Sequence, residues 1–255
     1  MRKIAVNALL ILVVGWSGVL SAGNNGKDLW KRAVAVAENN QHWVPGRLVS
    51  HIKMLSRKGR VKDHIETWLK LEENEDGRIV ASLEKYIKNG VDETEKRRER
   101  FFEAQKKREA ERKEEDDDSE NRGGYAIGLQ DHPFAAESQD AVSFQLLKTS
   151  VSVAGKACSL FTYEQKLKGP KAIVRTGKVW IHRETGIPVQ QEFTLDPLPS
   201  RVKRFTQRIV YHSDSADAWY PATLEIDGVG GFLFIKKYFQ SRVAFSRYFH
   251  SKTTK

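Results

Sequence analysis

Cysteine is nearly absent from this sequence, because Cys158 is the only one among 255 residues. A single cysteine forms no disulfide within the chain, and it excludes the sites in which several cysteines hold zinc. Cys158 lies in the apolar pattern ACSLF, so we expect a small buried hydrophobic residue there. The seven histidines lack the close spacing that is typical of metal ligands. We therefore expect no metal and no cofactor.

The common catalytic signatures are also missing. The sequence has no GxSxG, no HExxH, no Walker loop and no GxGxxG. The glycine-rich DGVGG at residues 227–231 lies between two predicted strands, which favours a hairpin turn over a phosphate-binding loop. His182 with Glu184, and His212 with Asp214, leave acid–base chemistry as an alternative, such as a lipid hydrolase. Our main expectation is a protein without catalytic residues.

Long apolar runs are confined to the beginning of the chain. Arg2 and Lys3 precede an apolar run from Ile4 to Trp16, and small residues follow it. This order is typical of a secretory signal peptide, and the run is short for a membrane span. We expect residues 1–22 to be removed and the rest to be exported. An N-terminal anchor helix is the alternative.

Positive charge is in excess, with a formal net charge of +10 and a pI near 9.6. Such a balance favours anionic partners, namely phospholipid headgroups, nucleic acid or acidic proteins. Basic and aromatic residues interleave at residues 201–208 and 236–249. Export makes nucleic acid an unsuitable partner, so we expect none. An anionic membrane surface or an acidic protein fits that compartment better.

Two segments show helical patterns. Residues 27–40 place Trp30, Ala33, Val34 and Ala37 on one face, with Asp28 as a candidate N-cap. Residues 93–122 alternate acidic and basic side chains three or four positions apart, with almost no apolar stripe. We predict an insertion over residues 93–133, either a solvated helix or disordered, within a domain of residues 23–250. A mobile lid or partner-binding arm is the sharper interpretation.

The rest of the chain has strand patterns. Three strands are predicted within residues 46–88 and eight after Ala141, separated by short glycine-containing turns. About eleven short strands in succession favour an antiparallel meander, either a sandwich or a barrel. Aromatic residues occur in nearly every strand of the second half. We expect them to line the inner face of a curved sheet, as a core or as an apolar trough.

A family resemblance follows from particular segments. The segments LWKRA, WVPGRL, NGVDET, GKVWIHRETGIPVQQEF and WYPATLEIDGVGG resemble those of LolA-like outer-membrane lipoprotein-sorting proteins, the periplasmic lipoprotein carriers. The resemblance runs from about Lys27 to Phe249 and rests on strand and turn signatures. It implies an α+β fold that is mainly β, an unclosed antiparallel barrel of about eleven strands with helices covering the opening.

The resemblance also implies a function without chemistry. Such a protein is a periplasmic carrier or chaperone that binds acyl chains of lipoproteins or phospholipid, with a protein partner in the inner or outer membrane. An arginine inside the barrel holds the lid in the family, and Arg47 is the candidate here. An envelope sensor or protein-interaction module of the same fold is an alternative. The expected ligand-binding residues are Arg47, Phe144, Phe161, Trp180, Phe193, Trp219, Phe232 and Phe234.

Overall fold

A computed structural model describes most of the chain, namely residues 17–40, 43–75, 77–114, 132–167, 172–198, 201–215, 218–232 and 235–251. Residues 1–16 of the expected signal peptide, residues 115–131 of the charged insertion and Phe234 lie outside the described residues. The side chain of Phe232 is also outside the description. Removal of residues 1–22 therefore stays a prediction.

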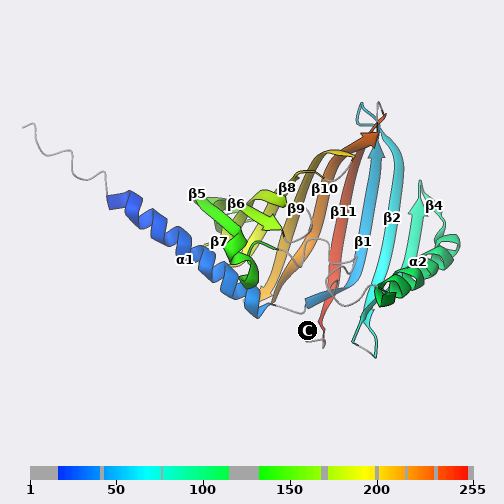
Figure 1. Cartoon of the computed structure of the whole chain (residues 1–255), viewed down its shortest axis with the longest axis horizontal. Coiled ribbons are helices and arrows are strands. Elements are labelled where there is room, and N and C mark those ends of the chain that lie inside the picture. Colours follow the sequence, from blue (N-terminus) through cyan, green and yellow to red (C-terminus); the bar gives the residue numbers. More distant parts are fainter. Residues whose placement is uncertain are drawn as a thin grey trace, which may run out of the picture.

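One antiparallel sheet of eleven strands forms the body of the molecule, in the order β4-β3-β2-β1-β11-β10-β9-β8-β7-β6-β5 (Figure 1). Its two edges, β4 and β5, do not pair with each other, so the sheet stays unclosed. This confirms the predicted fold class. The strands are β1 Trp43–Leu55, β2 Val61–Glu73, β3 Ile79–Lys88, β4 Val91–Asp92, β5 Val142–Val153, β6 Lys156–Leu167, β7 Ile173–His182, β8 Pro188–Asp196, β9 Val202–Ser215, β10 Ala218–Phe232 and β11 Ile235–His250.

The division into strands differs from the prediction in two places. Residues 227–231 form no turn, because they continue β10 and pair with β11 from Gln240 to Lys236. The two predicted strands at the C-terminal end are a single strand, β11. Seven strands therefore follow Ala141 instead of eight. The short β4 was predicted as the end of the third strand, and it restores the total to eleven.

The first helix, α1, spans Ser17–Asn39 and so begins before the predicted segment. Asp28 consequently lies inside the helix and does not cap it. The predicted apolar face is confirmed, because Trp30, Ala33 and Ala37 are buried and Val34 packs against them. Among the described helices, none combines the length and apolar character that crossing a membrane requires.

The described part of the charged insertion is helical, since α2 spans Thr94–Glu114. Thr94 starts it: its amide donates to Asp92 Oδ1 at 2.9 Å, and its hydroxyl accepts the Tyr86 amide at 2.9 Å. The Thr94 hydroxyl also donates to Asp92 Oδ1 at 2.5 Å, and this bond, together with that from the Thr94 amide, holds the pKa of Asp92 below its usual value. Phe101 is the main apolar contact of α2 with the sheet. Among the helix side chains that the structure describes, those of residues 94–107, most of the others are exposed.

Pairing register assigns each residue of the sheet to one of two faces, because directly opposed residues share a face. One row across six strands consists of largely buried residues. We call the face that carries it the inner face, and its opposite the outer face. The row contains Phe161, Val179, Gln191, Ile209, Leu224 and Val243.

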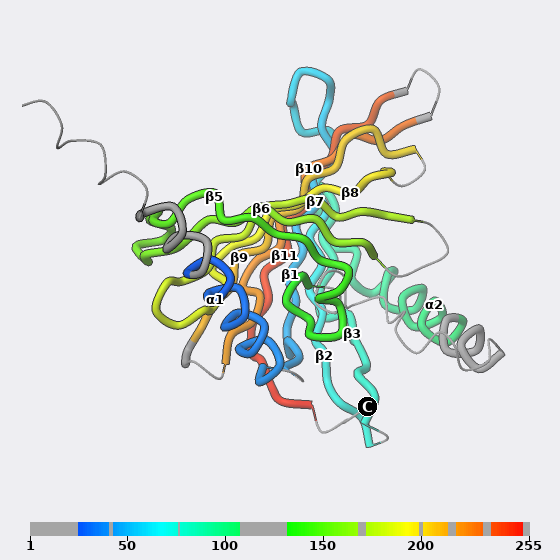
Figure 2. Tube along the Cα trace, turned by 60° about the vertical axis from the view of Figure 1, so that its left-hand side comes forward, coloured from blue at the N-terminus to red at the C-terminus, as the bar shows by residue number. Residues whose placement is uncertain are grey.

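Both helices cover the inner face. Helix α1 packs against the core at the β5–β9 end, and Figure 2 shows it lying across these strands. At the other end, Phe101 of α2 contacts a second apolar cluster that contains Leu69 and Leu83. Leu69 is opposite Leu48, and Leu48 is opposite Phe245, so this cluster shares the inner face. The middle of the inner face lies between the two helices.

Candidate functional site

The middle of the inner face carries apolar side chains that remain partly exposed. They come from β9, β10, β11 and β1, the strands between the regions that α1 and α2 cover. Each packs against a buried cluster with one side and keeps another side accessible. We call this surface the apolar strip, and define it by Leu48, Phe205, Ile226, Val243 and Phe245.

Trp30 of α1 fills the neighbouring part of the inner face. Its side chain is 1% exposed and its ring stacks on Phe144, with centroids 4.2 Å apart and planes 5° apart. Phe134 and Phe161 surround the same ring at 4.8 and 5.6 Å. The indole Nε1 donates to Gln139 Oε1 at 3.0 Å, so its polar atom is also satisfied. The Trp30 side chain therefore fills space within the half-barrel, on the inner face of the unclosed sheet.

The segment before β5 completes this cover. It contains a 3-10 helix, η1 (Ala136–Ala141), and Phe134, which is fully buried. Gln139 ties the segment together, because its Nε2 donates to the carbonyls of Pro133 and Ala135, both at 2.9 Å. The same side chain accepts the Trp30 hydrogen bond. Helix α1 and this segment thus form one covering layer.

Polar contacts hold α1 to the sheet at two places. At its C-terminal end, the Asn40 side chain accepts the Trp219 amide at 2.8 Å and donates to the Trp219 carbonyl. Further back, Arg32 donates to the carbonyls of Glu184 and Arg183 at 3.0 and 3.1 Å. Gly186 in that β7–β8 turn has φ +78°, and a Cβ there would lie 2.9 Å from Arg32 Cβ. The turn therefore needs glycine for its conformation and for the approach of α1.

A buried arginine lies on the inner face, and the sequence analysis missed it. Arg175 is 6% exposed, and its Nη1 donates to Gln165 Oε1 at 3.0 Å. Its guanidinium lies 4.6 Å from the centroid of the Phe193 ring, within reach of a cation–π interaction. Residues two and four positions apart on a strand share a face, so the spacing of Arg175 from Gly177 and Val179 was the sequence signal that it points inward. Arg175 is thus a positive charge inside the half-barrel.

Two tyrosines and a glutamine form a buried polar group nearby. Gln191 Nε2 donates to the Tyr163 hydroxyl at 2.5 Å, and the Tyr211 hydroxyl donates to Gln191 Oε1 at 2.9 Å. Burial raises the pKa of both phenols well above their usual value, because an ionised phenolate would lose its hydration there. Both tyrosines therefore remain protonated in the folded chain.

This gives a prediction for alkaline pH. Above about pH 10 the unfolded chain releases the two phenolic protons while the folded chain keeps them. The unfolded state then binds fewer protons, so the free energy of unfolding should fall by about 1.4 kcal/mol per pH unit for each tyrosine. Urea unfolding from about pH 9 to about pH 11 measures the slope. Tyr163→Phe should remove one tyrosine's share, and an unchanged slope would contradict the assignment.

The structure brings four of the predicted ligand-binding residues together. Phe144, Phe161, Phe193 and Trp219 all belong to, or pack against, the core cluster beneath α1. Trp180 lies on the outer face instead, because the buried Val179 and Ile181 beside it point inward. Phe232 and Phe234 have no described side chain. Ligand binding by any of these residues stays a prediction.

Arg47 also lies on the outer face, in contrast to the interior position that the resemblance implied. It pairs with Ser246 of β11, whereas its neighbour Leu48 points inward. Its guanidinium forms an ion pair with Glu84 at 3.0 Å and lies 5.2 Å from the Trp68 ring centroid. These contacts are within the sheet. Arg175, by contrast, lies on the inner face.

The structure places His182, the histidine of the first expected histidine–carboxylate pair, beside Thr185 of the β7–β8 turn. His182 Nδ1 lies 2.9 Å from Thr185 Oγ1, and that oxygen also accepts the Ile187 amide at 3.2 Å. The His182 side chain therefore shapes the β7–β8 turn. His212 is exposed, with its ring 6.0 Å from that of Tyr220. The side chain of Asp214 lies outside the description, so its expected pairing with His212 stays a prediction.

Comparisons with known proteins identify solved structures only. No family model matches the chain, and no curated protein matches it. A DUF1329 family protein from Desulfovibrio piger shares 10% identity over 90% of this chain and 94% of that chain, with a TM-score of 0.36. An outer membrane lipoprotein-sorting protein domain from Vibrio parahaemolyticus has the same identity and coverage, with a TM-score of 0.38.

A third similar structure is the complex of MucA and MucB from Pseudomonas aeruginosa. It shares 9% identity over 90% of this chain and all of that chain, with a TM-score of 0.24. The domain from Vibrio parahaemolyticus is named as a lipoprotein-sorting protein, which is the family whose segments the sequence resembles. Because every TM-score is below 0.5, no property of these proteins is assigned to this chain.

Proposed function

We propose that this protein is a periplasmic carrier without enzymatic activity, which binds acyl chains of lipoproteins or lipid on the inner face of its unclosed sheet. The observation that supports it best is the apolar strip, which stays partly exposed between α1 and α2. Adjacent strands are about 4.8 Å apart, so a strip over four strands offers about 15 Å of apolar surface. Each buried CH₂ of a chain contributes about 0.8 kcal/mol on such a surface.

The cover over the inner face supports a carrier that opens. Helix α1 places only a few large side chains into the half-barrel, with Trp30 the deepest. Phe144 and Phe161 contact Trp30 in the closed form. If α1 moves away, the same two rings join the apolar strip and extend the surface for an acyl chain. The covering helix and the ligand thus compete for the same aromatic side chains.

A matched pair of substitutions on β11 tests the proposal. Phe245 belongs to the apolar strip, whereas Ser246 points to the outer face opposite Arg47. Phe245→Glu places a charge against the acyl chain and should weaken binding of a fluorescent fatty-acyl probe by at least about tenfold, or about 1.4 kcal/mol. Ser246→Glu adds the same charge on the other face and should bind the probe like the unmodified protein.

Native mass spectrometry of the purified protein provides an independent measurement. Bound phospholipid or lipoprotein-derived acyl chains are expected in the unmodified protein and in Ser246→Glu, and their loss in Phe245→Glu. Thermal unfolding checks that both variants are folded. Equal probe binding by folded Phe245→Glu and Ser246→Glu, with no lipid in either, would contradict the carrier and favour a protein-interaction module of the same fold.

A further inference from the structure

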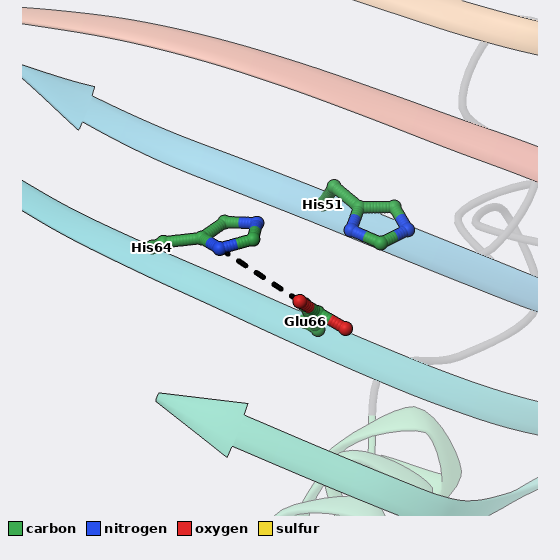
Figure 3. A group of neighbouring side chains, drawn as sticks. All are labelled: His51, His64 and Glu66. Atoms are coloured by element: carbon green, nitrogen blue, oxygen red, sulfur yellow. Dashed lines mark ion pairs between the residues drawn. The ribbon is translucent and has the colours of Figure 1, made fainter. Parts of the chain in front are cut away.

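Two histidines and a glutamate gather on the outer face of β1 and β2. His51 of β1 is directly opposite Glu66 of β2, and His64 precedes Glu66 by two residues on the same face. Figure 3 shows all three side chains on one side of the two strands. His51 and His64 are thirteen positions apart in the chain, and the β1–β2 hairpin makes them neighbours.

The distances suit a shared ligand. Ligand atoms of the three residues all lie within 4.8 Å of one another, and His64 Nδ1 is 3.7 Å from Glu66 Oε1. The two imidazole rings are stacked, with centroids 5.9 Å apart and planes 20° apart. Ligand atoms around tetrahedral zinc are separated by roughly 3.3 Å, given bonds of about 2.0 Å. The ligand atoms therefore have to approach one another by at most about 1.5 Å to reach that spacing.

The polar atoms of this group are incompletely satisfied. His64 Nε2 is buried and has no hydrogen-bond partner among the described residues. Such an atom loses its hydration without compensation, which is unfavourable unless another group binds to the imidazole. A metal ion bound to His64 Nε2 would supply the partner that this atom lacks.

We propose that His51, His64 and Glu66 form a binding site for a divalent transition-metal ion of the zinc class. Two imidazoles and a carboxylate are the donors that zinc accepts, whereas magnesium and calcium favour sites made of oxygen atoms alone. Three protein ligands leave one tetrahedral position open to solvent or to another molecule. This inference is independent of acyl-chain binding, because the outer face carries the site.

The surroundings leave room for a fourth ligand. The three residues line an open pocket of about 510 Å³ with Lys53, Glu225, Asp227 and Arg242 among its other walls. Glu225 interacts with Arg242 at 3.8 Å, and Asp227 accepts a hydrogen bond from Gln240 at 2.9 Å. These carboxylates are therefore engaged on β10 and β11. Among the described residues, the three proposed ligands are the group whose ligand atoms lie within 4.8 Å of one another.

Zinc titration of the full chain without a histidine tag tests the site. Isothermal calorimetry should show one Zn²⁺ per chain, and Co²⁺ as a spectroscopic probe should give the intense visible absorption of tetrahedral coordination. His64→Ala and Glu66→Gln should each weaken Zn²⁺ binding by at least about tenfold. Glu66→Gln keeps the size of the side chain and removes the charge, so it isolates the carboxylate.

His212→Ala is the matched control, because it removes an exposed histidine of β9 on the outer face and leaves the three ligands unchanged. It should bind Zn²⁺ like the unmodified protein. Zinc should also raise the melting temperature of the unmodified protein and of His212→Ala, and leave that of Glu66→Gln unchanged. Binding of equal strength in all of these proteins, or no binding to the unmodified one, would overturn the proposal.

Discussion

Trp30→Ala is expected to lower the free energy of unfolding by about 3–5 kcal/mol. The substitution removes a side chain that is 1% exposed and leaves a cavity among Phe134, Phe144 and Phe161. It also leaves Gln139 Oε1 without the indole donor. Chemical denaturation of the purified variant measures the loss, and Lys31→Ala on the exposed side of the same helix should change stability by less than about 0.5 kcal/mol.

The same variant bears on the proposed function. If acyl chains use the space beneath α1, Trp30→Ala should bind a fluorescent fatty-acyl probe more rapidly than the unmodified protein, because the indole that fills this space is removed. Trp30→Phe keeps an aromatic ring and should lie between the two in stability. A loss of less than about 1 kcal/mol in Trp30→Ala would show that Trp30 does not occupy the core in solution.

The second large effect is expected at Gly177 of β7. A Cβ atom there would lie 2.3 Å from the Glu192 carbonyl oxygen, 2.8 Å from Phe193 Cβ and 2.9 Å from the Tyr163 ring. Backbone and packed side chains surround the position, so the added methyl cannot be accommodated without moving β8. We expect Gly177→Ala to destabilise the protein by about 3 kcal/mol, at the upper end of overpacking effects.

Thr176 provides the control for this substitution. It precedes Gly177 on the same strand, is exposed and points to the outer face. Thr176→Ala should cost less than about 1 kcal/mol, the range of strand propensities. Guanidinium unfolding of the two variants gives the comparison. Similar stabilities for Gly177→Ala and Thr176→Ala would mean that β7 and β8 pack less closely than the structure indicates.

Local patterns predicted the parts of the fold that local interactions determine. The spacing of Trp30, Ala33 and Ala37 gave the buried face of α1 because apolar residues three or four apart share one side of a helix. Gly186 was predicted to be in a turn, and its φ of +78° requires a residue without a side chain. Each of these two features depends on residues that are close together in the sequence, so it can be recognised from the sequence.

Residues 227–231 show where this approach fails. The glycines of DGVGG were interpreted as turn residues, but Gly228 lies in β10 opposite Phe239 of β11. A Cβ at Gly228 would be 2.1 Å from the Phe239 ring, so glycine is needed there for packing across strands. The partner is eleven positions away in the sequence. Turn chemistry and close packing favour the same residue, and only the register distinguishes them.

The candidate site was predicted in part for a related reason. Period-two patterns tell which residues share a face, but they do not tell which face is inner when both carry apolar residues. Around Trp180 and Arg47 both faces do, and both residues proved to lie on the outer face. The core contacts of Phe161 and Phe193 followed from their positions on strands covered by α1. The neighbourhood of His51 and His64 depends on hairpin register, which separation along the chain does not reveal.

In the proposed carrier, the hydrogen bonds between Asn40 and Trp219 would limit how α1 leaves the sheet. The Asn40 side chain binds both the amide and the carbonyl of one residue in β10, so this end of the helix is held to the backbone of the sheet. The Arg32 bonds are exposed, and water replaces such bonds at little cost. In the carrier that we propose, α1 would therefore turn about Asn40 when it opens. Such a movement would withdraw Trp30 from the core while the connection to β1 stays in place.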